Sequence, residues 1–250
     1  MRSFGIIAIL SMAATPCLAG PPYDVDDPGT AEYRHYEVNT SYTSTQVEGC
    51  EGAGLGVEAN YGYSKNIQLT LGIGGSTLRE TGSPRTCGLD DSHAEFKWRF
   101  QEESAHKLPI SVHYIVTVPT SNSPHGMGSG RVDHTCLFAT GKTFGKAALF
   151  ANVGGNIPGD SDEQSNLVYG SLLTYQATEK LNLGAEVIGG TPGAKDDPAD
   201  LTYGVGMTYE FKPDRSLMLA VSHSTRGMAD VNVYAGIQMI LGPKEKAAAK

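Results

Sequence analysis

Apolar and polar residues alternate one by one over most of the chain. The clearest case is the segment 201–211, where Thr, Gly and Glu residues separate six apolar ones. These are Leu201, Tyr203, Val205, Met207, Tyr209 and Phe211. Successive side chains of a β-strand point to opposite faces, so this period predicts strands with one apolar and one polar face. No long stretch has the 3.6-residue period of a helix, and we predict an all-β fold.

The same alternation recurs along the chain in roughly twelve segments of about 8 to 14 residues. We expect strands at 33–46, 54–64, 67–78, 92–103, 108–118, 130–140, 146–154, 165–178, 181–191, 199–211, 216–223 and 231–241.

The connections between these segments alternate in length. Short turns are expected at 64–66, 103–107, 142–146, 178–180 and 212–215. Longer loops rich in Gly, Pro, Ser and Asp are expected at 47–53, 79–91, 119–129, 155–164, 192–198 and 224–230. Short turns at one end and long loops at the other are typical of outer-membrane barrels, and an even number of strands puts both termini on the periplasmic side. The pattern predicts an antiparallel up-and-down transmembrane β-barrel.

Aromatic residues support a membrane setting. Eight of them are expected near the short turns, as one interfacial girdle. They are Tyr61, Tyr63, Trp98, Phe100, Phe138, Tyr175, Tyr209 and Phe211. The alternative is a soluble sandwich or lipocalin-like barrel with its apolar faces turned inward. The opposite faces carry Gly, Thr, Asn and Gln rather than mostly long charged residues, and the strands outnumber the eight of a lipocalin, which favours the membrane barrel.

The N-terminal residues have the pattern of a bacterial signal peptide. Arg2 is followed by an apolar stretch at 4–14 that is too short to span a bilayer, and small residues precede a cleavage site after Ala19. We therefore divide the chain into a signal peptide (1–19), an N-terminal periplasmic segment (20–32), a barrel (33–241) and a C-terminal tail (242–250). The expected location is the outer membrane of a Gram-negative cell.

Charged residues on the polar faces are the candidates for function. Those expected to line the lumen are Glu58, Glu95, Lys97, Arg99, Arg131, Asp133, Glu186 and Glu210. They either pair into a network that plugs a narrow barrel or line a path for a small solute. Inward-facing glycines leave space beside them, and barrels of about twelve strands lie between filled small barrels and open porins. The sequence leaves plug and pore both open.

Three cysteines follow the expected cleavage site. Cys50 and Cys87 fall in the first two long loops, where an oxidising compartment would allow a disulfide between them. The alternative is two free thiols. Cys136 falls within a strand, on its apolar face, and is expected to behave as a small hydrophobic residue.

No catalytic, cofactor or metal site is predicted. The glycine-rich stretch 126–131 lacks the third spaced Gly of a dinucleotide site, and the His residues have no metal-ligand spacing. An outer-membrane lipid hydrolase would need a paired Ser and His on the lipid-facing side. Ser222 and His223 point to opposite faces, and Ser111 and His113 share the inward face. The formal net charge of -8 gives no reason to bind nucleic acid.

Several short motifs resemble one known family. They are Leu69–Leu71 after the Lys65-Asn66 turn, Phe96–Glu103, Val116–Thr120, Gly128–Asp133, Leu172–Thr178 and Leu181–Gly184. Nearly the whole chain after residue 19 is similar to the outer-membrane, transporter-like β-barrels grouped under the MetA pathway of phenol degradation. The resemblance implies a barrel that passes hydrophobic or aromatic solutes and carries over no catalytic residues. One departure is the end of the last strand, where Gly242-Pro243 follows Leu241 in place of a terminal aromatic residue.

The sequence thus predicts a passive outer-membrane channel or transporter for small solutes, whose partners are membrane lipid and a solute in the lumen. A structural or binding barrel with a plugged lumen is the alternative, and a lipid hydrolase is a weaker third. Protein partners and the oligomeric state are left open.

Overall fold

The computed structural model describes residues 20–47, 49–121, 128–160, 163–193, 199–225 and 231–243, and the expected signal peptide lies outside them. Within these ranges the secondary structure is entirely β, and no helix is long and apolar enough to cross a membrane. The strands are β1 (Tyr36–Val47), β2 (Cys50–Ser64), β3 (Ile67–Glu80), β4 (Thr86–Leu89), β5 (Ser92–Gln101), β6 (Ile110–Val118), β7 (Asp133–Phe144), β8 (Ala147–Ile157), β9 (Asn166–Gln176), β10 (Leu181–Gly190), β11 (Asp200–Lys212), β12 (Arg215–Ser224) and β13 (Val231–Leu241).

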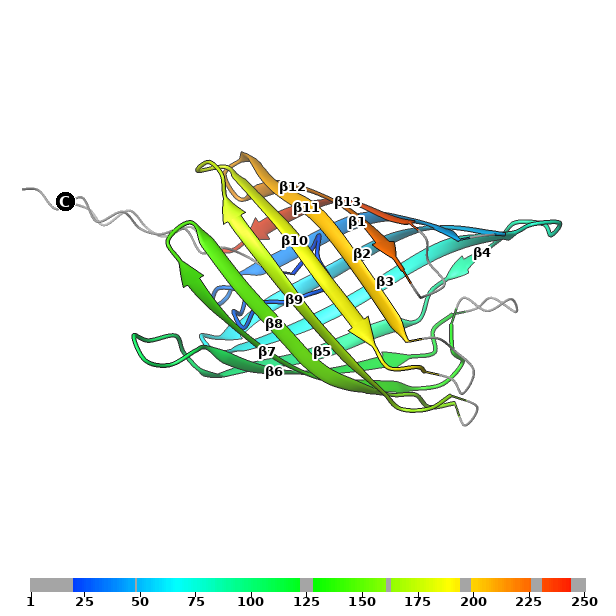
Figure 1. The fold of residues 1–250 in the computed structure, drawn as a ribbon, viewed down its shortest axis with the longest axis horizontal. Helices are drawn as coiled ribbons and strands as arrows, with labels where there is room; N and C mark the ends of the chain where they lie inside the picture. Colours follow the sequence, from blue (N-terminus) through cyan, green and yellow to red (C-terminus); the bar gives the residue numbers. More distant parts are fainter. Residues whose placement is uncertain are drawn as a thin grey trace, which may run out of the picture.

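Twelve of these strands, all except β4, form a closed antiparallel barrel (Figure 1). Each pairs with its neighbours in the chain, and β1 pairs with β13 from Tyr36↔Leu241 to Gln46↔Val231. Closure satisfies the backbone hydrogen bonds of every barrel strand, which a bilayer requires. The predicted twelve-stranded antiparallel barrel is confirmed. The sequence did not predict β4, a four-residue strand that pairs with β3 beyond the barrel.

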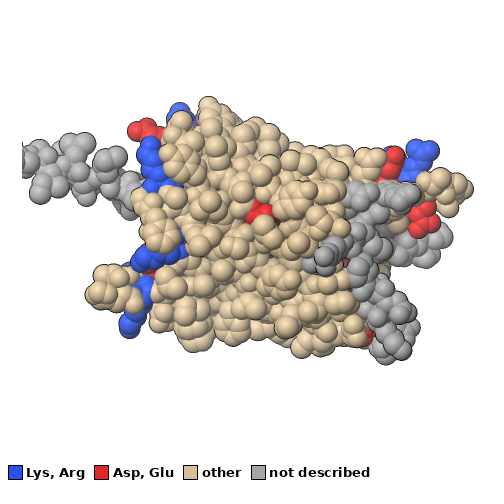
Figure 2. Space-filling view, in the orientation of Figure 1, with Lys and Arg blue, Asp and Glu red and all other residues tan. Residues whose placement is uncertain are grey.

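The two ends of the barrel differ as the loop lengths predicted. β1 begins and β13 ends at the end with the short turns (Figure 1). Lys and Arg side chains gather at that end (Figure 2). One of the two-residue turns joins β7 to β8 through Gly145, whose φ of 64° suits a residue without a Cβ. We call the end of the barrel with the short turns the turn end, and the end with the long loops the loop end.

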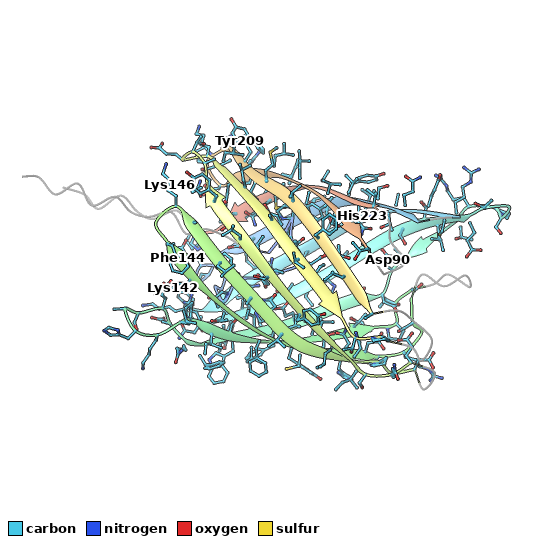
Figure 3. All side chains as sticks on the ribbon, viewed as in Figure 1. Asp90, Lys142, Phe144, Lys146, Tyr209 and His223 are labelled. Carbon is cyan, nitrogen blue, oxygen red and sulfur yellow. The ribbon has the colours of Figure 1, made fainter. Side chains whose placement is uncertain are left out.

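The outer wall of the barrel is apolar. Leu71, Tyr203 and other large apolar side chains are exposed, whereas their neighbours Thr70 and Thr202 are buried and face inward. At the turn end the outward aromatic residues include Phe144 and Tyr209 (Figure 3). Phe138 departs from the predicted girdle. It pairs with Val112 and Val153 near the middle of β7, because that strand continues to Phe144. The exposed apolar wall is the surface that a bilayer would cover.

The apolar wall leads to a depth-dependent prediction. Val205 is exposed near the middle of β11, and Tyr209 lies at the turn end of the same strand and face. We expect Val205→Arg to destabilise the barrel in lipid by about 2–4 kcal/mol and Tyr209→Arg by about 0–1 kcal/mol, because charge costs most at mid-bilayer. Reversible urea unfolding in lipid vesicles measures both. Equal costs for the two variants would contradict this placement of the membrane.

Candidate functional site

The segment just before β1 runs inside the barrel. Tyr23 and Val25 are buried against the inner faces of β8–β10, together with Ala148, Phe150, Leu172 and Ile188. A Cβ on Gly184 would lie 2.4 Å from the Tyr23 hydroxyl, and one on Gly170 would lie 2.6 Å from Val25 Cγ2. The inward glycines therefore form the space that these two side chains fill. This position differs from the expectation of a segment outside the barrel.

Hydrogen bonds from the barrel hold the backbone of this segment, residues 20–32. Glu186 Oε2 accepts from the amides of Asp24 and Val25 at 3.0 and 3.1 Å. The side chain of Asn152 accepts from the Asp26 amide and donates to the Asp26 carbonyl, both at 2.8 Å. These contacts use backbone groups that would otherwise be buried without partners. The segment is thus fixed in one place within the lumen.

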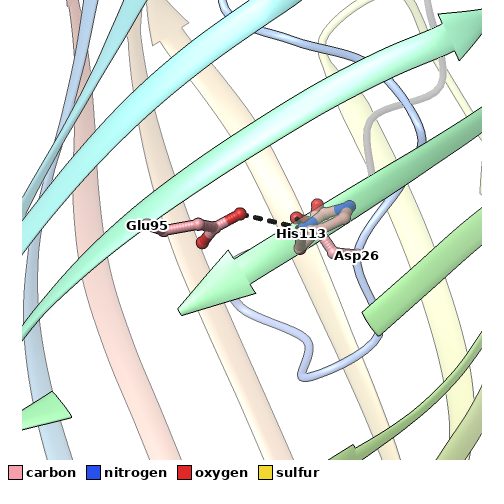
Figure 4. Close-up of side chains that lie close together, drawn as sticks. All are labelled: Asp26, Glu95 and His113. Atoms are coloured by element: carbon pink, nitrogen blue, oxygen red, sulfur yellow. Dashed lines mark ion pairs between the residues drawn. The ribbon is translucent and has the colours of Figure 1, made fainter. Parts of the chain in front are cut away.

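A charged cluster anchors the side chain of Asp26. Its Oδ2 lies 2.9 Å from Lys97 Nζ and 3.5 Å from His113 Nδ1. The same His113 nitrogen lies 2.9 Å from Glu95 Oε1 (Figure 4). Lys97 and His113 are buried, and a buried charge is stable only when it is paired. We call Asp26, Glu95, Lys97 and His113 the anchor cluster.

Ser111 lies beside the anchor cluster and gives it the geometry of a Ser-His-carboxylate triad. Ser111 Oγ lies 2.9 Å from His113 Nε2, on the opposite side of the ring from Glu95. Nucleophilic catalysis needs a hydroxyl that the substrate can reach. Ser111 and His113 are 0% and 2% exposed, and both lie inside the barrel wall, away from lipid. The arrangement therefore orients the His113 ring for the anchor cluster.

Three members of the anchor cluster could also ligate a metal ion. One ligand atom from each of Asp26, Glu95 and His113 lies within 4.8 Å of the others. Their sequence spacing could not show this, because they come from three separate segments. The Lys97 ammonium, 2.9 Å from Asp26 Oδ2, already supplies a positive charge to this carboxylate. The cluster is complete as an ion-pair network, and we assign no metal to it.

A cavity of about 290 Å³ lies on the other side of the lumen. The inner faces of β1, β2, β3 and β13 form its wall, with Pro21 and the loop-end residue Asp90 also in the lining. Glu58 Oε1 accepts hydrogen bonds from Asn60 at 3.1 Å and Asn39 at 3.4 Å, and Glu58 Oε2 lies 3.5 Å from His93 Nε2. We call this space the loop-end cavity. The N-terminal segment therefore fills the lumen beside β8–β10 and contacts Gln68 of β3 at the turn end through Ala31, while the loop-end cavity stays open.

The remaining predicted lumen residues lie towards the barrel ends. Arg99 donates to the carbonyl of Lys65 at 2.8 Å at the turn end, and Glu210 is at the turn end of β11. Asp133 begins β7 at the loop end, where its Oδ1 accepts from the Gly159 amide at 2.8 Å, and Arg131 precedes it as an exposed residue. The eight charged residues thus belong to separate groups and do not form one network.

The predicted disulfide between Cys50 and Cys87 is not formed. Both are free, on β2 and β4, which pair with opposite edges of β3. The register pairs Cys50 with Glu80 and Cys87 with Thr77, so two strand spacings of about 4.8 Å and a shift along β3 separate them. A disulfide needs Cα atoms within roughly 7 Å. The prediction was wrong because β4 was not foreseen. Cys136 is exposed on the outer face of β7, as expected.

No protein-family model and no curated protein matches this chain. Solved structures do match. An outer membrane channel from Pseudomonas putida F1 has a TM-score of 0.71 at 13% identity, over 88% of this chain and 100% of that one. KdgM porin and NanC porin each have a TM-score of 0.58, at 9% and 7% identity, over 80% and 82% of this chain and 98% of each of theirs.

Identities this low establish the fold alone. The resemblance to outer-membrane transporter-like barrels is confirmed at that level, and its link to phenol degradation stays a prediction. The chain has the fold of an outer-membrane channel.

Proposed function

We propose that this protein is a passive outer-membrane channel for small solutes. The observation that carries the proposal is the loop-end cavity, which remains in the lumen beside the N-terminal segment. A barrel built only as a scaffold would be expected to fill its interior with side chains, as small barrels do. Here the inward glycines of β2 and β3, among them Gly54, Gly56 and Gly74, keep that side of the lumen open.

The chemistry of the inner wall also supports passage of solute. Ser41, Thr43 and His93 are among the residues that line the loop-end cavity, so this part of the lumen offers hydrogen-bonding groups to a passing molecule. Pore selectivity depends on such lining groups and on the width of the constriction. A preference for aromatic or hydrophobic solutes, which the family resemblance implies, stays a prediction.

The second candidate is a binding barrel that transports nothing. The observation in its favour is the position of Tyr23 and Val25, which fill the lumen beside β8–β10. A lipid hydrolase is not supported, because the Ser111 hydroxyl is buried. In the proposed channel the solute crosses without a chemical step.

Reconstitution tests the proposed function. We expect vesicles containing the folded chain to swell in isotonic solutions of small solutes and to conduct ions, and the solute to be recovered unchanged. The rate should fall as the solute approaches the size of the cavity. Vesicles with a closed eight-stranded barrel serve as the control. Folded protein that gives neither swelling nor conductance would favour the binding barrel, and chemical conversion of the solute would contradict passive passage.

A further inference from the structure

The loop-end cavity carries an excess of negative charge. Glu58, Asp90 and Asp91 line it, and no Lys or Arg is among its described lining residues. His93 is the one lining residue that can become cationic, and it lies beside Glu58. Even a protonated His93 leaves two of the three carboxylate charges without a counter-charge in the lining. The cavity therefore favours a positively charged occupant.

One of the lining residues, Asn39, has an acceptor atom without a hydrogen-bond partner. Asn39 is 4% exposed, and its Nδ2 donates to Glu58 while its Oδ1 has no hydrogen-bond partner. A buried acceptor without a partner costs free energy, so such an atom indicates a missing donor. The donor that fits beside carboxylates is an N–H group carrying positive charge.

The cavity is shaped for an organic ion rather than a bare metal ion. Its volume of about 290 Å³ is near the lower limit of small-molecule sites. A metal ion would need several oxygen ligands close together at about 2.3 Å. Pro21 and Tyr234 line the cavity together with Gly56 and Gly74, so a ring residue and an aromatic residue lie in the same lining as the carboxylates, a combination that suits a short alkyl ammonium.

We propose that the loop-end cavity is a binding site for small primary amines in their ammonium form, held by Glu58, Asp90 and Asn39. Glu58 is suited to the role because its side chain is 31% exposed and reachable. Asp90 Oδ2 lies over Gly74, 3.0 Å from where a Cβ would be. Selection of amines for passage through the barrel rests on the proposed function. Binding of an amine in the cavity does not.

Calorimetry on the folded barrel in detergent tests the binding. We expect n-butylammonium to bind, and neutral pentanol and anionic valerate to bind at least about tenfold more weakly. Glu58→Gln, Asp90→Asn and Asn39→Ala should each weaken butylammonium binding by about tenfold, since each removes a charge or an acceptor. Glu80→Gln is the matched control, because it removes an exposed carboxylate of β3 outside the lining and should leave binding unchanged.

The heat-modifiable gel shift of each variant establishes that it is folded. Three results would each overturn the inference. They are equal binding of butylammonium and pentanol, wild-type binding of butylammonium by folded Glu58→Gln and Asn39→Ala, and a loss of binding in Glu80→Gln equal to that in the other variants. Conductance through the same preparations separates the two proposals. A barrel that binds butylammonium but conducts nothing contradicts the channel and leaves the amine site, and the reverse outcome removes only the amine site.

Discussion

Deletion of residues 20–31 is expected to raise the single-channel conductance of the barrel by roughly threefold or more, because the cross-section of a pore limits its conductance. The segment lies inside the barrel and packs on β8–β10. Its removal would join that half of the lumen to the loop-end cavity. Planar-bilayer recordings of the folded variant measure the change, and a conductance equal to that of the full chain would contradict the placement of the segment.

Two substitutions at one position make the deletion test specific. Tyr23→Ala removes the ring that fills the space over Gly184 and Gly206, and should give a smaller conductance increase or more frequent openings. Tyr23→Phe is the matched control. The Tyr23 hydroxyl has no hydrogen-bond partner, so its loss should leave conductance unchanged. An effect of Tyr23→Phe as large as that of Tyr23→Ala would show that ring packing is not what holds the segment.

Lys97→Met is expected to destabilise the folded barrel by about 2–3 kcal/mol, because removal of one partner leaves buried charge without compensation. Asp26 would lose its partner at 2.9 Å and remain close to Glu95, around the same His113 nitrogen. The segment should also be released, so the conductance should rise towards that of the deletion. Urea unfolding in lipid vesicles measures the stability.

Lys142→Met is the control for Lys97→Met. Lys142 Nζ pairs with Glu103 at 3.1 Å, but both side chains are partly exposed near the turn end. Exposed ion pairs contribute about 0–1 kcal/mol, so the loss should be small. The double variant Lys97→Met/Asp26→Asn should recover part of the stability, since it removes both charges. Equal stability of Lys97→Met and Lys142→Met would contradict the role of the anchor cluster.

The strands and their faces could be predicted from the sequence because they depend on local order. Alternation specifies which side chains share a face, as for Leu71 outside and Thr70 inside. The lengths of the connections specify which end carries the loops. Neither the faces of the strands nor the position of the loops depends on contacts with a distant segment of the chain. Phe138 shows the limit of this reasoning, since a shift of a few residues in the end of β7 moves it from the girdle to mid-strand.

The position of the N-terminal segment could not be predicted, because its contacts are not local. Asp24 and Glu186, which hydrogen-bond, are 162 residues apart, and the segment has no period of its own. Ser111 and His113 were seen to share a face, but their proximity to Glu95 and Asp26 needs the pairing of β5 with β6 and the entry of the segment. The loop-end cavity could not be predicted either, because it is the part of the lumen that the N-terminal segment leaves unfilled. Four residues of alternation were too few to reveal β4.

The contacts of the N-terminal segment also constrain the order in which the barrel assembles. The segment directly precedes β1, yet it is held by Lys97 of β5, by His113 of β6 and by the apolar surface of β8, β9 and β10. That surface exists only after most of the chain has been synthesised and those strands have paired. β1 must in turn meet β13 to close the wall. The segment that precedes β1 in the chain can therefore dock only after the strands up to β10 have paired.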